Sequence, residues 1–171
     1  MELTNIYAVL GQQEQATQEF EAIAKIYEAV PENLRDGAVN TDKWELLIDV
    51  YRQILDIDPE NIEAKENIAN ALMNLGTSEE ATAQFKDLAE ELRERGDIVR
   101  STEFLQKVTS LEPTDLSSRF ELASNLMSKG KFDEAVLEYK GIAVAAKKNN
   151  DLDQAEDAYK RIREQIGRAH V

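Results

Sequence analysis

A pattern of residues that recurs after 54 positions constrains the fold of this chain more than any other feature. Small and large apolar residues alternate at fixed offsets in it. The first copy contains Ile68, Ala69, Leu72, Gly76, Ala81, Phe85 and Leu88, and the second contains Leu122, Ala123, Leu126, Gly130, Ala135, Tyr139 and Ile142. Repetition at a fixed period is typical of solenoids, in which each unit buries its apolar face against its neighbours. The sequence therefore predicts an array of stacked units.

An earlier copy of the pattern carries an insertion. Tyr51 and Pro59 precede Leu105 and Pro113 by 54 positions, whereas Phe20 precedes Phe85 by 65. The difference places 11 additional residues between the second and third predicted helices. They coincide with the polar stretch 31–41, PENLRDGAVNT, which we expect to be a loop.

Apolar residues spaced by three and four positions, together with stop and capping residues, predict helices almost throughout. Gly76, Gly96, Gly130 and Gly167 are expected to end helices, and Asp97, Asp151 and a Thr77–Glu80 capping box are expected to begin them. The buried faces of the second and third helices are predicted to hold Ala16, Phe20, Ile23, Ala24 and Tyr27, and Trp44, Leu47, Ile48, Tyr51, Ile54 and Leu55. The predicted helices span residues 2–10, 13–30, 42–57, 62–75, 79–95, 98–111, 116–129, 132–148 and 152–166.

The composition limits the chemistry that the chain can perform. The 171 residues include no cysteine, so disulfides and thiolate zinc sites are excluded. The single histidine, His170, lies at the tail, so the common nucleophile–base pairs are missing. The stretch 56–61 lacks the glycine and the distal glutamate of a calcium loop. The sequence thus predicts a non-enzymatic protein with no catalytic residue, no cofactor and no metal site.

The charge is strongly acidic and unevenly placed. Residues 1–115 hold 25 acidic and 10 basic residues, and residues 116–171 hold 9 and 10. Nucleic-acid binding needs clustered Lys and Arg, so nucleic acid is not an expected partner. The acidity either keeps the surface solvated or attracts a basic partner. No apolar run approaches the roughly 20 residues of a membrane helix, and the first residues do not form a signal peptide. We therefore expect no membrane insertion and a cytoplasmic location.

The repeated positions resemble the tetratricopeptide repeat (TPR), a helix pair of about 34 residues with a W-x2-L-G-x2-Y…A-x3-F…P pattern. Matches occur in residues 62–95 and 116–149, and near the start at Leu3, Tyr7, Gly11, Ala16, Phe20 and Ile23. The resemblance implies a right-handed all-α solenoid of antiparallel helix pairs. The chain departs from the family by a third helix in each unit. We expect one domain, 1–171, with nine helices in units 1–61, 62–115 and 116–169, either capped by a short first helix or cut from a longer repeat protein.

In TPR proteins, exposed residues on the first helix of each pair line a concave groove for a partner peptide or helix. Lysines and arginines of the family's carboxylate clamp are missing, so an acidic tail is not the expected ligand. Met73, Phe120 and Met127 either anchor an apolar side chain or are core contacts. Carried over by position, the groove residues are Asn5, Glu63, Glu66, Asn70, Met73, Asn74, Ser117, Phe120, Ser124, Met127 and Ser128.

The function predicted from the sequence is that of a protein-interaction scaffold whose groove binds a basic or apolar partner segment. Two alternatives stay open. One is self-assembly into a homo-oligomer, or co-scaffolding, through the ends of the solenoid. The other is a regulatory domain of a larger enzyme. Trp44 either packs between helices or forms a binding edge with the 31–41 loop.

Overall fold

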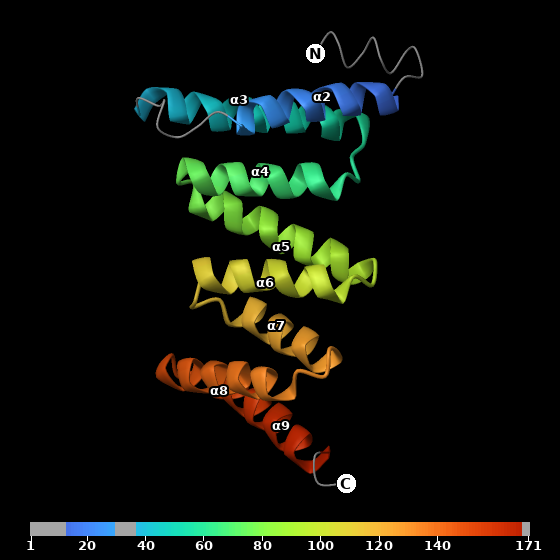
Figure 1. The fold of residues 1–171 in the computed structure, drawn as a ribbon. Coiled ribbons are helices and arrows are strands. Elements are labelled where there is room, and N and C mark those ends of the chain that lie inside the picture. Colours follow the sequence, from blue (N-terminus) through green and yellow to red (C-terminus); the bar gives the residue numbers. More distant parts are fainter. Residues whose placement is uncertain (1–12, 30–36, 169–171) are drawn as a thin grey trace. The chain divides into compact units, whose positions relative to one another are not determined.

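The computed structural model describes residues 13–29 and 37–168, in which every regular element is a helix (Figure 1). The all-α fold class is confirmed there. The predicted helix at residues 2–10 lies outside the described residues. The helices are α2 (Gln13–Glu28), α3 (Gly37–Ile57), α4 (Ile62–Leu75), α5 (Ser78–Glu94), α6 (Ile98–Leu111), α7 (Leu116–Ser128), α8 (Phe132–Lys148) and α9 (Leu152–Arg168).

The chain divides into two compact units, residues 1–84 and 85–171, and the division falls inside α5. In the first unit α2 packs on α3 and α3 on α4. In the second unit α6 packs on α7, α7 on α8 and α8 on α9. Helices that follow one another within a unit run in opposite directions (Figure 1). The single domain with units 1–61, 62–115 and 116–169 stays a prediction.

Residues at the helix ends explain where most helices begin and stop. Gly76 ends α4 with a φ of 81°, in the left-handed region that glycine adopts without a steric penalty. Asp97 begins α6 by accepting a hydrogen bond from the Arg100 amide, and Asp151 accepts one from the Gln154 amide at the start of α9. Asn150 precedes Asp151 with a φ of 60°. Helices α4 and α6 have the predicted bounds, 62–75 and 98–111.

Several predicted boundaries differ from the structure by one or two residues, and the differences at the start of α3 and the end of α9 concern residues that were expected to lie in a loop or to end a helix. Helix α3 begins at Gly37 and not at residue 42, so the last part of the predicted loop is helical, whereas residues 31–36 lie outside the described residues. No proline stands between Gly37 and Thr41 to stop the helix. Helix α9 continues through Gly167 to Arg168. A glycine costs a helix only about 1 kcal/mol, so its presence alone does not end one.

The N-terminal cap of α5 also differs in detail. Thr77 stands directly before α5, as predicted. Its hydroxyl donates a 2.9 Å hydrogen bond to the Leu72 carbonyl, near the end of α4. Because that carbonyl belongs to the last turn of α4, the hydroxyl helps to close the preceding helix.

The core of the first unit combines small and large side chains. On α2 the residues Ala16, Phe20 and Ala24 are buried, as predicted, whereas Ile23 is 39% exposed and so was wrongly placed on the buried face. The side chain of Tyr27 lies outside the described residues. Trp44 is half-buried, with Lys43 Nζ 4.7 Å from its ring centroid. The other buried apolar residues of α3 and α4 are Leu47, Ile48, Tyr51, Ile54, Ala64, Ile68, Ala69, Ala71 and Leu72.

The second unit has an apolar core with one buried polar link. Phe85 stacks on Phe104 at a centroid distance of 5.9 Å. Ser101, fully buried on α6, donates a 2.8 Å hydrogen bond to the Ala89 carbonyl of α5 and accepts a 3.0 Å hydrogen bond from Asn125 of α7. Helices α5, α6 and α7 are therefore linked by hydrogen bonds in the interior. The main apolar cluster consists of Ala123, Tyr139, Ile142, Ala143, Ala158 and Ile162.

Candidate functional site

The predicted groove residues of the first unit share one face of α4. Glu63 and Asn74 are exposed, Glu66 and Asn70 are half-buried, and Met73 is 40% exposed. Their spacing of three, four and seven positions places them along one stripe of the helix. The Asn74 amide donates a 2.8 Å hydrogen bond to the Asn70 carbonyl. The eleventh predicted residue, Asn5, lies outside the described residues.

The predicted groove residues of the second unit fall into two kinds. Ser117, Ser124 and Ser128 on α7 are exposed. Phe120 and Met127 pack against the main apolar cluster, and the Phe120 ring lies 5.8 Å from that of Tyr139. The sequence left open whether these residues anchor a partner side chain or contact the core, and in the structure both Phe120 and Met127 contact the core. Of the three predicted apolar anchors, Met73 is the one whose side chain is exposed.

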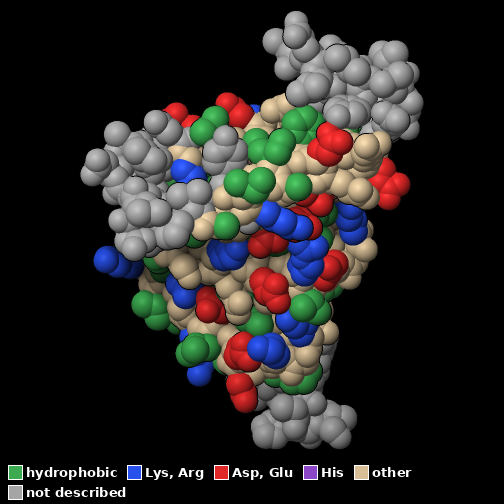
Figure 2. Space-filling view, turned by 45° about the horizontal axis from the view of Figure 1, so that its top comes forward, with side chains coloured by type: hydrophobic (Ala, Val, Ile, Leu, Met, Phe, Trp, Pro, Cys, Tyr) green, Lys and Arg blue, Asp and Glu red, His purple; other side chains and the backbone are tan. Residues whose placement is uncertain are grey.

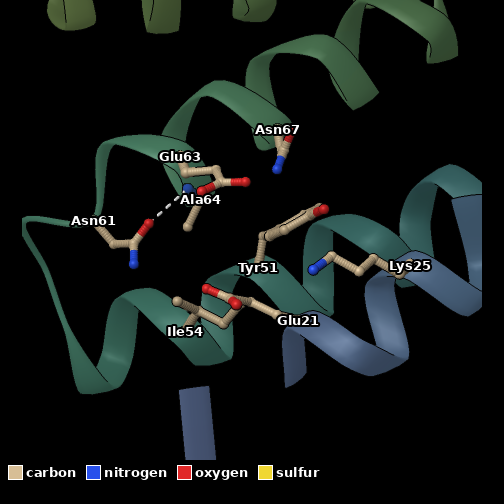
Figure 3. A pocket seen from close by; sticks show the side chains of 8 residues that line it. All are labelled: Glu21, Lys25, Tyr51, Ile54, Asn61, Glu63, Ala64 and Asn67. Carbon is tan, nitrogen blue, oxygen red and sulfur yellow. Dashed lines mark hydrogen bonds between the residues drawn. The ribbon is translucent and has the colours of Figure 1, made fainter. Parts of the chain in front are cut away.

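A cleft opens between α2, α3 and α4 in the first unit (Figure 3). We call it the first cleft. The cleft has a volume of about 140 Å³, and the buried residues Tyr51, Ile54 and Ala64 form its base. The polar ends of Glu21 and Lys25 on α2 and of Glu63 and Asn67 on α4 border this base (Figure 3). Its eighth lining residue is Asn61.

The polar side chains that line the first cleft differ in whether they already make hydrogen bonds. The Asn61 side-chain oxygen accepts a 2.9 Å hydrogen bond from the Ala64 amide and so begins α4. Within residues 13–29 and 37–168, no hydrogen bond or ion pair is found for the side chains of Glu21, Lys25, Glu63 or Asn67. Both carboxylates are therefore accessible to a ligand without breaking an existing contact.

A second cleft, of about 290 Å³, lies in the second unit between α5, α6 and α7. The Lys86 ammonium group is held by two carboxylates, 2.9 Å from Glu112 Oε2 and 2.8 Å from Asp115 Oδ2. Asp115 also accepts hydrogen bonds from the amide and hydroxyl of Ser118. The residues lining this second cleft are Lys86, Glu90, Leu105, Asp115, Ser117, Ser118 and Glu121.

These contacts shift the ionisation of two groups in the second cleft. Burial acts to raise the pKa of Asp115, but the hydrogen bonds from Lys86 and Ser118 outweigh it and hold the pKa below its usual value of 3.8. The hydrogen bonds to Asp115 and Glu112 raise the pKa of Lys86 above 10.5. The ion pair is therefore fully charged at neutral pH.

The two clefts occupy equivalent positions of the repeat. Lining residues of the first cleft on α3 and α4 precede those of the second cleft on α6 and α7 by 54 positions. Lining residues on α2 precede those on α5 by 65 positions. On the α2 and α5 sides the charges are exchanged, because Glu21 and Lys25 stand where the second cleft has Lys86 and Glu90. The remaining pairs are Tyr51 and Leu105, Asn61 and Asp115, Glu63 and Ser117, Ala64 and Ser118, and Asn67 and Glu121.

Of the predicted groove residues, Glu63 lines the first cleft and Ser117 the second. The repeat pattern of single helices does not indicate the other polar residues of the two clefts, among them Glu21, Lys25 and Lys86. The two repeat offsets are the signal that could have found them, since together they align Glu21 with Lys86.

Among the described residues, no group of three or more His, Asp or Glu side chains is arranged to hold a metal ion. Every helix in the described part of the chain falls short of the length and apolar character that crossing a membrane requires.

No protein-family model matches the chain, and no curated protein sequence matches it. Solved structures similar to it include TPR-like repeats of a Podosopora anserina putative kinesin light chain, with 18% identity, 98% of this chain and 93% of that chain covered, and a TM-score of 0.41. YrrB, described as a TPR protein with an unusual peptide-binding site, has 18% identity, coverages of 84% and 97%, and a TM-score of 0.35. MamA has 16% identity, coverages of 75% and 92%, and a TM-score of 0.35.

The repeat and the helices define an all-α helical repeat protein.

Proposed function

We propose that the chain is a protein-interaction scaffold that holds an extended segment of a partner protein along the exposed face of α4. The observation that carries the proposal is the continuity of this face with the first cleft. Glu63 lines the cleft and also begins the stripe that continues through Asn70, Met73 and Asn74. A partner segment on this stripe would therefore have a side-chain cleft at one end of its path.

The residue types on the stripe suit a peptide ligand. An asparagine amide both donates and accepts hydrogen bonds, so Asn70 and Asn74 are able to pair with the amide and carbonyl groups of an extended backbone. Met73 is exposed and unbranched, and a flexible thioether adapts to side chains of different shape. In this proposal α7 offers a second face through Ser117, Ser124 and Ser128, while Phe120 and Met127 support that face from the core.

A selection from a display library of random peptides tests the proposal. The wild-type chain is expected to enrich a set of peptides that bind more weakly to the double variant Asn70→Ala/Met73→Ala. The matched control is Arg52→Ala/Gln53→Ala, which truncates two neighbouring side chains of α3 that do not line the first cleft. Far-UV circular dichroism verifies that both double variants keep their helices. Equal binding of every enriched peptide to the two double variants would rule out this face.

A specific observation favours self-assembly as the second candidate function. A shallow, largely apolar depression of about 530 Å³ lies on α8 and α9, lined in part by Leu152, Tyr159 and Ile162. Tyr159 is 39% exposed, whereas Leu105, its counterpart 54 positions earlier, is 2% exposed. An apolar face of this kind is suited to association between copies of the chain.

Sedimentation velocity over a range of concentrations tests this candidate. If copies associate through α9, the mass should rise with concentration for the wild type and stay that of the monomer for Leu152→Glu, because a buried carboxylate is costly. Val99→Glu, at an exposed apolar position of α6, is the matched control. A wild-type mass that does not change with concentration would contradict self-assembly.

A further inference from the structure

We infer that the first cleft binds the lysine or arginine side chain of a basic partner segment. The inference rests on the proposed function, and it names the chemistry of the residue that the partner places in the cleft. Three observations carry it: the charge of the first unit, the accessible carboxylates of the cleft, and the way the equivalent cleft of the second unit is filled.

The charge of the chain is concentrated in the first unit. Residues 1–84 hold 17 acidic and 5 basic residues, whereas residues 85–171 hold 17 and 15. On the face shown in Figure 2, acidic and basic side chains are interspersed. The attraction of the first unit for a basic segment therefore does not come from a single acidic patch on that face. A net charge of −12 in one unit attracts basic segments over a distance of about one Debye length, roughly 8 Å at physiological salt.

The second cleft shows how this architecture holds a long cationic side chain. Lys86 reaches from α5 to the loop between α6 and α7, where Glu112 and Asp115 hold its ammonium group. Of these two carboxylate positions the first unit retains one, with Asp58 at the position of Glu112, and it has Asn61 at the position of Asp115. At the position of the lysine, α2 carries an acid, Glu21.

The first cleft therefore has the surroundings of a lysine site without the lysine at its equivalent position. Glu21 and Glu63 line it from two helices, and no ion pair is found for either in the described residues. Lys25 contributes one positive charge from one turn further along α2, so the charged lining residues sum to −1. A cationic side chain from a partner would neutralise this negative charge, and carboxylates accept charge-assisted hydrogen bonds from ammonium and guanidinium groups.

The size and the base of the first cleft fit one side chain. Its volume of about 140 Å³ is smaller than the roughly 300–1,000 Å³ of small-molecule sites. Tyr51, Ile54 and Ala64 provide a mostly apolar base. Lysine and arginine place an aliphatic stem on such a surface while the charged end remains among polar groups. The partner backbone would continue outside, along the face of α4.

Nuclear magnetic resonance on the ¹⁵N-labelled full chain tests the inference. The probes are acetyl-Gly-Lys-Gly-amide and the same tripeptide with norleucine, which keeps the stem without the charge, or with glutamate. We expect the lysine peptide to shift the Ala64 backbone amide and the side-chain amides of Asn61 and Asn67 saturably. The norleucine and glutamate peptides should shift them at least about tenfold less at the same concentration, since a lost ion pair and a like charge each weaken binding.

The variant Glu21→Lys makes the test specific. It copies the arrangement of Lys86, so its own ammonium group is expected to occupy the cleft beside Asp58 and to weaken the lysine peptide about tenfold. Glu45→Lys makes the same change of charge at an exposed position of α3 outside the cleft, and it should stay within about twofold of the wild type because salt screens distant charges.

The outcomes separate this inference from the proposed function. Stronger shifts with the glutamate peptide would show that Lys25 and the asparagines bind an anion, and equal shifts in Glu21→Lys and wild type would show that lysine binds elsewhere. Either result, or no shift with any tripeptide, overturns the inference. The proposed function would still stand if peptides selected by display required Asn70 and Met73 but contained no lysine or arginine. It would fail if no selected peptide depended on them.

Discussion

Removal of the Ser101 hydroxyl should destabilise the second unit more than removal of its partner Asn125. Ser101 has no exposed surface and Asn125 is 4% exposed. Ser101→Ala removes both hydrogen bonds of the link and leaves the buried amide of Asn125 without this acceptor. A lost buried hydrogen bond costs about 1 kcal/mol and an unsatisfied buried group about 1–3 kcal/mol, so we expect a total of about 2–4 kcal/mol.

Asn125→Ala leaves the bond from Ser101 to the Ala89 carbonyl intact. It removes one hydrogen bond and some packing, and we expect a loss of about 1–2 kcal/mol. In the double variant the orphaned amide no longer exists. Its cost should therefore be smaller than the sum of the single costs by about 1 kcal/mol.

Urea unfolding followed by far-UV circular dichroism measures all three variants, with the free energy of unfolding obtained by linear extrapolation. Ser110→Ala serves as the control, because this exposed serine of α6 bonds only within its own helix and should change stability by less than about 0.5 kcal/mol. The reasoning is refuted if Ser101→Ala matches the control, or if the two single costs add within error in the double variant.

Four further substitutions test packing, electrostatics and a helix end. Ala81→Leu and Ala135→Leu, at positions with no exposed surface, should each lower the free energy of unfolding by about 1–3 kcal/mol through overpacking, and unchanged melting temperatures would contradict this. Lys86→Met should cost at most about 1 kcal/mol at neutral pH, because the ion pair is partly exposed. The pKa of Asp115 is depressed in the folded protein, so the ionised carboxylate stabilises the fold above pH 3.8, and this stabilisation is lost as the pH falls through the folded pKa. When the free energy of unfolding is measured against falling pH, it should therefore decrease less in Lys86→Met than in the wild type. Gly76→Ala should cost about 1 kcal/mol in thermal melts from its left-handed φ alone, because no atom lies within 4 Å of the added Cβ.

The helices could be predicted where residues at their ends act locally. Asp97 and Gly76 act through their own hydrogen bonds and backbone angles, so the limits of α4 and α6 follow from a few neighbouring residues. The start of α3 could not be predicted in this way. The polar residues before it look like a loop in the sequence, yet Gly37–Thr41 extend a helix whose later turns are fixed by packing against α2 and α4.

The candidate site was predicted less completely than the fold. A resemblance to a repeat family points to one face of one helix, and Glu63 and Asn70 were found on that basis. The first cleft instead draws side chains from three helices, so Glu21 and Lys25 become neighbours of Glu63 only after the chain folds. Their exchange of charge with Lys86 and Glu90 was visible in the sequence, but only when the 65-position offset is applied across the insertion.

The 54-residue repeat contains an odd number of helices, which affects how equivalent helices within one unit are directed. In the second unit, α6 and α9 are related by 54 positions, and three alternations of direction separate them, so the two helices point opposite ways (Figure 1). Two helices at the same position of the repeat therefore run in opposite directions, whereas an even number of helices per repeat would make them run in the same direction. A ligand with a fixed N-to-C sense could not reuse one docking geometry on both helices, and each copy would be free to diverge toward its own specificity.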